Sequence, residues 1–188
     1  MSAYAFTPKM SAQNPTLRRF SDMTTAKSKT NWNAVYQREL PRVYNYFRYR
    51  LGDNALAEDL TAATFEKAWR AREKYKRDRA AFSTWLFTIA RNVAIDHLRT
   101  HRAHVSFDAL EQIPASDSPH EAYTRQAELA QLGALLAQLN EHERELIALK
   151  YGAELTNREI ARQLGMSESN VGTTLHRIVE KLKAKWEG

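Results

Sequence analysis

Apolar residues recur at steps of three and four along most of this chain, and that period restricts the fold more than any other feature of the sequence. The stripe in residues 32–51 consists of Val35, Leu40, Val43, Tyr44 and Phe47. Residues at this spacing share one face of a helix, whereas a half-buried strand would need strict alternation, and no convincing alternating segment occurs. The sequence therefore predicts an all-α fold.

The helices are predicted in two groups. The front group spans 32–51, which Gly52 closes, then 54–72 and 83–101, and residues 73–81 are read as a charged loop. The back group begins at 123–139 and continues with a helix capped by Asn140 and ended by Gly152. Two further helices follow, and Thr156 and Ser167 are predicted to cap their N-terminal ends.

Charge separates the same two groups. Residues 32–104 hold fourteen basic and eight acidic side chains, residues 105–120 hold three acidic and no basic ones, and residues 121–188 hold nine basic and ten acidic ones. A chain of 188 residues is long enough for one ordinary domain or two small ones. We expect two small helical domains, 32–104 and 121–188, joined by an acidic, helix-poor linker at 105–120.

The first 31 residues are rich in Ser, Thr and Lys and lack a sustained period. We expect a disordered tail, and an organelle transit peptide is the alternative for such a basic leader. No stretch is apolar and long enough for a membrane span or a secretory signal, so a cytoplasmic protein is expected. The net charge of +6 favours an anionic partner such as nucleic acid.

Residues 156–182 carry the clearest motif. Thr156 and Glu159 form a capping box, Gly165 stands where a helix would stop in a left-handed turn, and Ser167 can cap the helix that follows. Two helices across so short a turn form the helix-turn-helix of DNA-binding proteins. A plain packing unit with a polar face is the alternative interpretation.

The outward side of the second helix supplies candidate contacts to duplex DNA. Its early polar side chains could reach base edges in the major groove, and its later basic ones suit phosphates. These candidates are Ser169, Asn170, Thr173, Thr174, Arg177 and Lys181. The half that carries them is nearly neutral and gains little from counterion release, so we expect another part of the chain or a partner to contribute to DNA binding.

The front half combines aromatic and basic residues in a way that suits single-stranded DNA. The third helix places Asn92, Asp96 and Arg99 on one side, and the loop before it offers Tyr75, Lys76 and Arg77. A plain core role remains open for Tyr75, Phe82 and Trp85.

Catalytic and metal chemistry find no support in the motifs. Cysteine is absent, and no phosphate-binding glycine loop or catalytic signature occurs. His97, His101 and His104 share a helix face, but the neighbouring arginines would repel a cation. We expect no enzyme activity, no metal and no cofactor.

Two segments resemble the extracytoplasmic-function (ECF) sigma factors of bacterial RNA polymerase. Residues 58–70 and 82–99 are similar to region 2 of that family, and residues 155–183 are similar to region 4. The resemblance covers roughly residues 32–185, with the two regions in the family's order. It implies a transcription initiation factor whose region 2 captures an unpaired base of the minus-ten element and whose region 4 reads the minus-thirty-five element as duplex.

The resemblance also implies partners and site residues. Region 2 would bind the clamp helices of the largest polymerase subunit, region 4 would bind the flap, and an anti-sigma factor is a further expected partner. The implied polymerase contacts are Glu58, Asp59, Leu60, Phe65 and Glu66. The implied minus-ten contacts are Tyr75, Lys76, Arg77, Phe82, Asn92, Asp96 and Arg99.

Two departures from the family pattern stand out. Ala62 and Ala63 replace the usual Gln-Glu pair of the clamp-binding helix, and residues 171–174 replace a more basic sequence in the recognition helix. Gly172 in that helix hints at a close backbone approach to DNA or a partner. Two other readings stay open: a self-sufficient helix-turn-helix regulator, and an interaction protein that only sequesters a partner.

Overall fold

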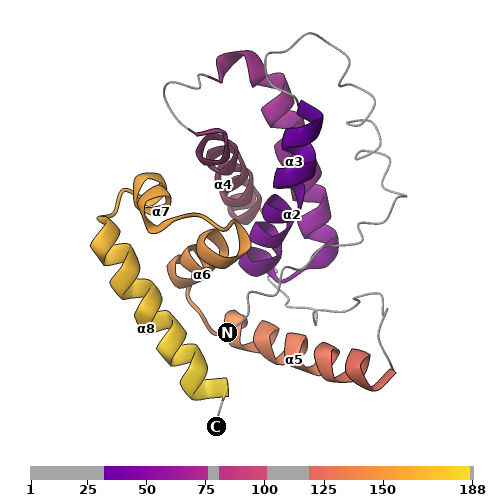
Figure 1. Cartoon of the computed structure of the whole chain (residues 1–188), viewed down its shortest axis with the longest axis vertical. Coiled ribbons are helices and arrows are strands. Elements are labelled where there is room, and N and C mark those ends of the chain that lie inside the picture. The colour runs from indigo at the N-terminus through magenta and orange to yellow at the C-terminus, as the bar shows by residue number, and fades with distance from the viewer. Residues whose placement is uncertain (1–31, 76–80, 101–118, 187–188) are drawn as a thin grey trace.

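The structure is a computed structural model that describes residues 32–75, 81–100 and 119–186 (Figure 1). The tail at 1–31, the basic loop residues Lys76 and Arg77, and residues 101–118 of the linker segment lie outside the described residues. All described secondary structure is helical, which confirms the all-α prediction. None of the described helices is long and apolar enough to span a membrane.

The front half is a bundle of three helices, α2 (Trp32–Leu51), α3 (Asn54–Arg70) and α4 (Phe82–Thr100). Gly52 has a φ of 78°, the left-handed conformation that ends α2. The Asp53 side chain then caps α3 by accepting a 2.9 Å hydrogen bond from the backbone N–H of Leu56. Helix α3 ends two residues earlier than predicted, and a 3₁₀ turn, η1 (Arg72–Lys74), occupies the start of the predicted loop.

The back half contains α5 (Pro119–Ala137), α6 (Glu141–Ile147), the π-helical turn η2 (Ala148–Gly152), α7 (Asn157–Leu164) and α8 (Glu168–Trp186). The predicted start of α5 at residue 123 was wrong by four residues. Pro119 falls in the segment predicted to be a helix-poor linker, but it is the first residue of the helix. Proline is favoured there because its missing N–H would have no intrahelical partner.

The predicted caps of the back half are confirmed. Asn140 and Glu143 form a complete capping box on α6, and Thr156 and Glu159 form another on α7. Gly165 has a φ of 68° and ends α7, as its position predicted. These caps fix the ends of both helices locally, with each capping side chain bonding a backbone N–H three residues away.

Arg144 ties α5 to α6. Its guanidinium donates to the backbone carbonyls of Leu136, Ala137 and Leu139 at 3.2, 3.1 and 2.8 Å. These carbonyls lie at the C-terminal end of α5, where the last turn of a helix leaves carbonyls without intrahelical partners. The arginine therefore fixes the corner between the two helices.

The two halves pack directly on each other in the described residues. Buried apolar residues of both halves form one continuous cluster. Helix α2 packs on η2 about as extensively as it packs on its own neighbour α3. Figure 1 shows α6 and α7 lying beside the front bundle, with α8 on the outside.

Candidate nucleic-acid interface

Helices α7 and α8 form the predicted helix-turn-helix. The turn runs through Gly165, and the Oγ of Ser167 caps α8 by accepting a 3.1 Å hydrogen bond from the backbone N–H of Asn170. The inner faces are buried at Ile160 and Ala161 of α7. The matching residues of α8 are Val171, Leu175 and Ile178. This packing leaves the polar side of the first turns of α8 facing away from the core.

The predicted duplex contacts lie on that outward side. Ser169, Asn170, Thr173 and Arg177 are exposed, and Thr174 is half-buried. The Thr174 hydroxyl lies 3.2 Å from the amide oxygen of Asn170, to which it donates. A side chain held in this way presents its amide group in a more defined direction than a free one.

Lys181 has a different environment from its predicted phosphate contact. Its ammonium group lies 3.2 Å from the carboxylate of Glu143, at the start of α6. The pair is partly exposed, so it contributes little by itself. Contact with a phosphate would require Lys181 to exchange this carboxylate for the DNA backbone.

Nothing within the described fold requires a glycine at position 172. A Cβ built there would meet the Asn157 amide nitrogen at 3.4 Å, an ordinary contact. The close approach suggested by the sequence is therefore not an approach to another part of the described chain.

A cluster of five aromatic rings forms one end of the front bundle. It joins the start of α2, the end of α3, the residue after η1 and the start of α4. Its members are Trp32, Trp69, Tyr75, Phe82 and Trp85. The ring centroids of Tyr75 lie 5.3 Å from Phe82 and 5.2 Å from Trp85, and Trp32 lies 5.5 Å from both Trp69 and Phe82. We call this group the aromatic end.

Part of the aromatic end was missed in the sequence. Trp32 lies more than thirty residues before the other members, and Arg72 stacks over the ring of Trp69 at 4.4 Å. All five members of the aromatic end are only half-buried. Each ring packs on its neighbours and also keeps an accessible part. The same rings can therefore belong to the core and still offer a surface to a base.

The polar residues predicted on α4 are exposed along its outer side. Asn92, Asp96 and Arg99 all face solvent. Asp96 lies 3.7 Å from Lys67 of α3 and 3.5 Å from Arg99, so its charge is balanced by two bases. His97 of the histidine row is half-buried, while His101 and His104 lie outside the described residues. No set of three or more acidic or imidazole ligands within the described ranges could hold a metal ion.

Helix α3 presents most of the predicted polymerase contacts on its outer side. Asp59 is exposed and Glu58, Leu60 and Glu66 are partly exposed. Desolvation, followed by the charge of Asp59, raises the pKa of the Glu58 carboxyl above its ordinary value of 4.5.

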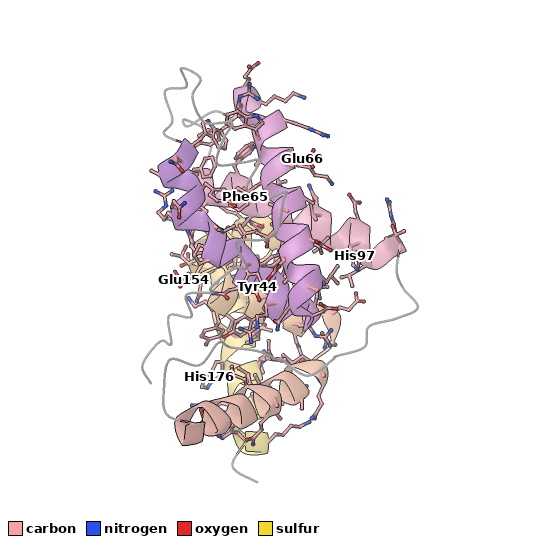
Figure 2. The ribbon with its side chains drawn as sticks, turned by 90° about the vertical axis from the view of Figure 1, so that its right-hand side faces the viewer. Tyr44, Phe65, Glu66, His97, Glu154 and His176 are labelled. Carbon is pink, nitrogen blue, oxygen red and sulfur yellow. The ribbon has the colours of Figure 1, made fainter. Side chains whose placement is uncertain are left out.

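Phe65 corrects one predicted contact. Its side chain is 3% exposed and packs on Tyr36 with ring centroids 4.8 Å apart. The apolar period of α3 turns this ring into the bundle, while the neighbouring Glu66 faces outward (Figure 2). Phe65 is therefore a core residue that supports the surface and does not form it.

Comparison with known proteins finds matches for both halves of the chain. Residues 35–104 match the family model for sigma-70 region 2, and residues 129–182 match the model for sigma-70 region 4. The chain is 30% identical over 155 residues to the ECF RNA polymerase sigma factor SigM of Bacillus subtilis (strain 168), a match that covers 80% of this chain and 91% of SigM. The chain belongs to the ECF sigma factors of RNA polymerase.

This sigma factor is also similar to a longer relative. It is 32% identical over 151 residues to the ECF sigma factor BldN of Streptomyces coelicolor, and this match covers 79% of this chain but only 57% of BldN. Its fold is similar to that of the sigma factor RpoE in a co-crystal structure with the anti-sigma factor NepR from Bartonella quintana. That match has a TM-score of 0.68 at 18% identity, and it covers 84% of this chain and 97% of RpoE. Like the family, this sigma factor is a transcription initiation factor that directs polymerase to promoters.

Proposed function

We propose that α8 reads the minus-thirty-five element as duplex DNA. The observation that carries this proposal is the helix-turn-helix, whose second helix is capped by Ser167 and leaves its early polar residues exposed. In this motif the first turns of the second helix enter the major groove. Ser169, Asn170, Thr173 and Thr174 are then placed for base edges, and Arg177 and Lys181 for phosphates.

The aromatic end and the outer side of α4 would hold the melted minus-ten element. A flipped base loses stacking and pairing worth a few kcal/mol, which a pocket or a ring face can offset. Tyr75 and Phe82 offer ring surface, and Asn92, Asp96 and Arg99 line the adjacent helix face. The predicted contacts of Lys76 and Arg77 belong to the same proposal, although both lie outside the described residues.

The outer side of α3 would bind the polymerase. Glu58, Asp59, Leu60 and Glu66 form the proposed contact to the clamp helices, and the back half would bind the flap. An anti-sigma factor is a further proposed partner, because the structurally similar sigma factor RpoE was crystallised with the anti-sigma factor NepR. In this scheme residues 32–104 act as region 2, 105–120 as a linker and 121–188 as region 4, in a cytoplasmic protein without chemistry of its own and without a bound cofactor.

Transcription with purified core polymerase tests the proposal. Run-off synthesis on a library of promoters is measured with and without the chain, and selected promoters are sequenced. We expect transcripts from a defined subset that shares two conserved elements, and only when the chain is present. Transcription unchanged by the chain, or a footprint on duplex DNA without polymerase, would contradict it, and the footprint would indicate a self-sufficient regulator.

A further inference from the structure

Gly172 is an unfavourable residue in the interior of α8. It is the fifth residue of a 19-residue helix, where glycine is less favourable than any residue except proline. The backbone does not require it, because its φ is not among the positive values found at Gly52 and Gly165. Internal packing does not require it either, since a Cβ would meet only the side chain of Asn157. The explanation that remains is a bound partner that comes close to the helix backbone.

The side-chain amide of Asn157 faces Gly172 in a fixed orientation. Its Nδ2 lies 3.4 Å from the position that a Cβ of residue 172 would take. At the other end of the amide, the Nζ of Lys150, from η2, donates to Oδ1 at 2.9 Å. An ammonium group has no acceptor, so it holds the amide with the oxygen toward Lys150 and the NH₂ group toward Gly172. We call Lys150, Asn157 and Gly172 the Gly172 site.

The Gly172 site has donors that its own fold does not use. All three residues are only half-buried. Among the described residues, the Lys150 side chain forms no ion pair and makes one hydrogen bond, to Asn157, whose NH₂ group donates to none of them. A positive charge beside an N–H donor is the combination that binds an anion. The site therefore suits a ligand that is negatively charged and accepts hydrogen bonds.

Two acidic residues lie close to the site in the sequence, and neither cancels the charge of Lys150. The carboxylate of Glu159 accepts from the backbone N–H and the hydroxyl of Thr156, both at 2.8 Å. Glu168 lies one turn before Gly172 on α8, and its exposed side chain can turn toward solvent. The charge that a ligand meets at the site is therefore that of Lys150.

The helix-turn-helix brings a DNA strand to this place. In that motif the second helix enters the major groove while the first helix crosses the backbone of the duplex. Asn157 is the first residue of α7 and Gly172 begins the second turn of α8, so the site lies where the helix in the groove meets the strand beside it. Phosphate oxygens of that strand accept hydrogen bonds from amide side chains. A Cβ at position 172 would occupy the space in front of the Asn157 NH₂ group that such an oxygen needs.

We propose that the Gly172 site binds one backbone phosphate of the minus-thirty-five element. Asn157 donates to the phosphate oxygen, Lys150 orients the amide and adds positive charge, and Gly172 leaves room for the strand. The inference rests on the proposed function, because it requires α8 to lie in the groove. A phosphate contact carries no sequence information, so the site sets the position of α8 along the groove and thereby which base edges its side chains reach. It also supplies a backbone contact to a recognition helix that is less basic than the family pattern.

Gly172→Ala distinguishes this role from a role in folding, because stability and DNA binding should change in opposite directions. Alanine fits the free chain and is the better helix former, so the chain should unfold at a higher urea concentration. Promoter binding by the complex with core polymerase should weaken about 10-fold, as for the loss of a hydrogen bond to a charged group. Ala184→Leu, which adds bulk at an exposed position near the far end of α8, should leave binding unchanged. A Gly172→Ala variant that binds as tightly as wild type, or that is less stable than wild type, would overturn the proposal.

A scan with methylphosphonate, a neutral replacement for a backbone phosphate, identifies the contact. Each phosphate of the minus-thirty-five element is replaced in turn, and binding is titrated with complexes of core polymerase and each variant. We expect one position where the neutral group weakens wild-type binding about 10-fold but strengthens binding by Asn157→Asp, which places a carboxylate against the phosphate charge. An acidic residue suits the first turn of α7, so this variant should fold. Lys150→Met should lose most of the response at that position, and Lys150→Arg should keep it.

The results separate this inference from the proposed function. Wild-type binding that does not depend on the minus-thirty-five element would contradict the proposed function and this inference together. Binding that needs the element, with the same methylphosphonate profile for wild type and Asn157→Asp, would overturn this inference alone.

Discussion

The two candidate DNA surfaces of this sigma factor are built by different physical means. The aromatic end of region 2 is assembled from three helices and the residue after η1, whose rings pack on one another, in a half with fourteen basic and eight acidic residues. The α8 surface of region 4 is set by local caps and one left-handed glycine, in a half with nine basic and ten acidic residues. Aromatic rings and positive charge can bind unpaired bases, whereas a helix held at a fixed angle can enter the groove of an intact duplex.

Because the two surfaces are built differently, substitutions should affect them in different ways. Loss of a ring removes both binding surface and tertiary packing, because the same side chains serve both. Loss of a cap loosens a helix end and leaves the exposed polar side chains in place. Substitutions on the two surfaces should therefore change different steps of initiation, and the following predictions test this from the largest effect to the smallest.

Tyr75→Ala should have the largest effect. Stacking of a base on an aromatic ring is worth about 1–3 kcal/mol by alanine substitution, so open-complex formation should weaken by roughly 5- to 150-fold. Tyr75→Phe keeps the ring and should stay close to wild type. Permanganate reactivity of the melted strand and run-off yield measure the step. A similar loss with Tyr75→Phe would contradict stacking as the cause.

Arg177→Ala should weaken recognition of the minus-thirty-five element and leave polymerase binding intact. The loss of one phosphate contact should reduce the slope of log binding constant against log salt concentration by about one unit. Lys185→Ala, near the far end of α8, is the matched control, since it removes an equal charge and should leave the slope unchanged. Promoter binding by the holoenzyme is titrated at several salt concentrations. Loss of polymerase binding together with DNA binding would indicate a folding defect instead.

Thr156→Ala should destabilise region 4 by about 1 kcal/mol, because α7 loses the acceptor for the backbone N–H of Glu159. Thr156→Ser retains a hydroxyl and should be nearly neutral. Urea unfolding followed through methyl NMR signals of Leu175 in region 4 and Leu86 in region 2 separates the two halves. Equal shifts at both leucines would show that the packing between the two halves makes the molecule unfold as one body.

Acid should weaken region 4 before region 2. Desolvation raises the pKa of Glu159, but hydrogen bonds from the Thr156 backbone and hydroxyl, with the charge of Arg42, bring this pKa below 4.5 overall. Its contribution to stability is present above pH 4.5 and is lost as the pH falls through the folded-state pKa. Glu58 in region 2 has a raised pKa, so its unfavourable contribution is relieved as the pH falls toward 4.5. The same leucine signals, followed in urea between pH 6 and pH 3, measure this small difference.

Local features of this fold could be predicted from the sequence, because their signals lie within a few residues. The boxes at Asn140 and Thr156 and the glycine at 165 act across three or four positions, and each is confirmed. Pro119 shows the limit of such signals, because a proline can either end a helix or begin one. Its neighbours in the folded chain decide between the two, and here Pro119 begins α5.

Long-range features could not be predicted in this way. Tyr46 and Glu145 are 99 positions apart, and Trp32 reaches the aromatic end from the start of α2. In the sequence, Arg42, Tyr46 and Arg50 form an ordinary polar face of a helix. Nothing in a single sequence marks the exposed side of one helix as the partner of another, so the packing of the two halves and the burial of Phe65 came from the structure.

Arg144 determines that α5 and α6 are held together as one unit. Its three bonds to the end of α5 couple that helix to α6, and α6 packs on α8. A force on α5 is therefore passed through α6 to α8, and we expect the three helices to behave as one rigid unit. Arg144→Ala would remove the three hydrogen bonds and loosen the end of α5 from α6.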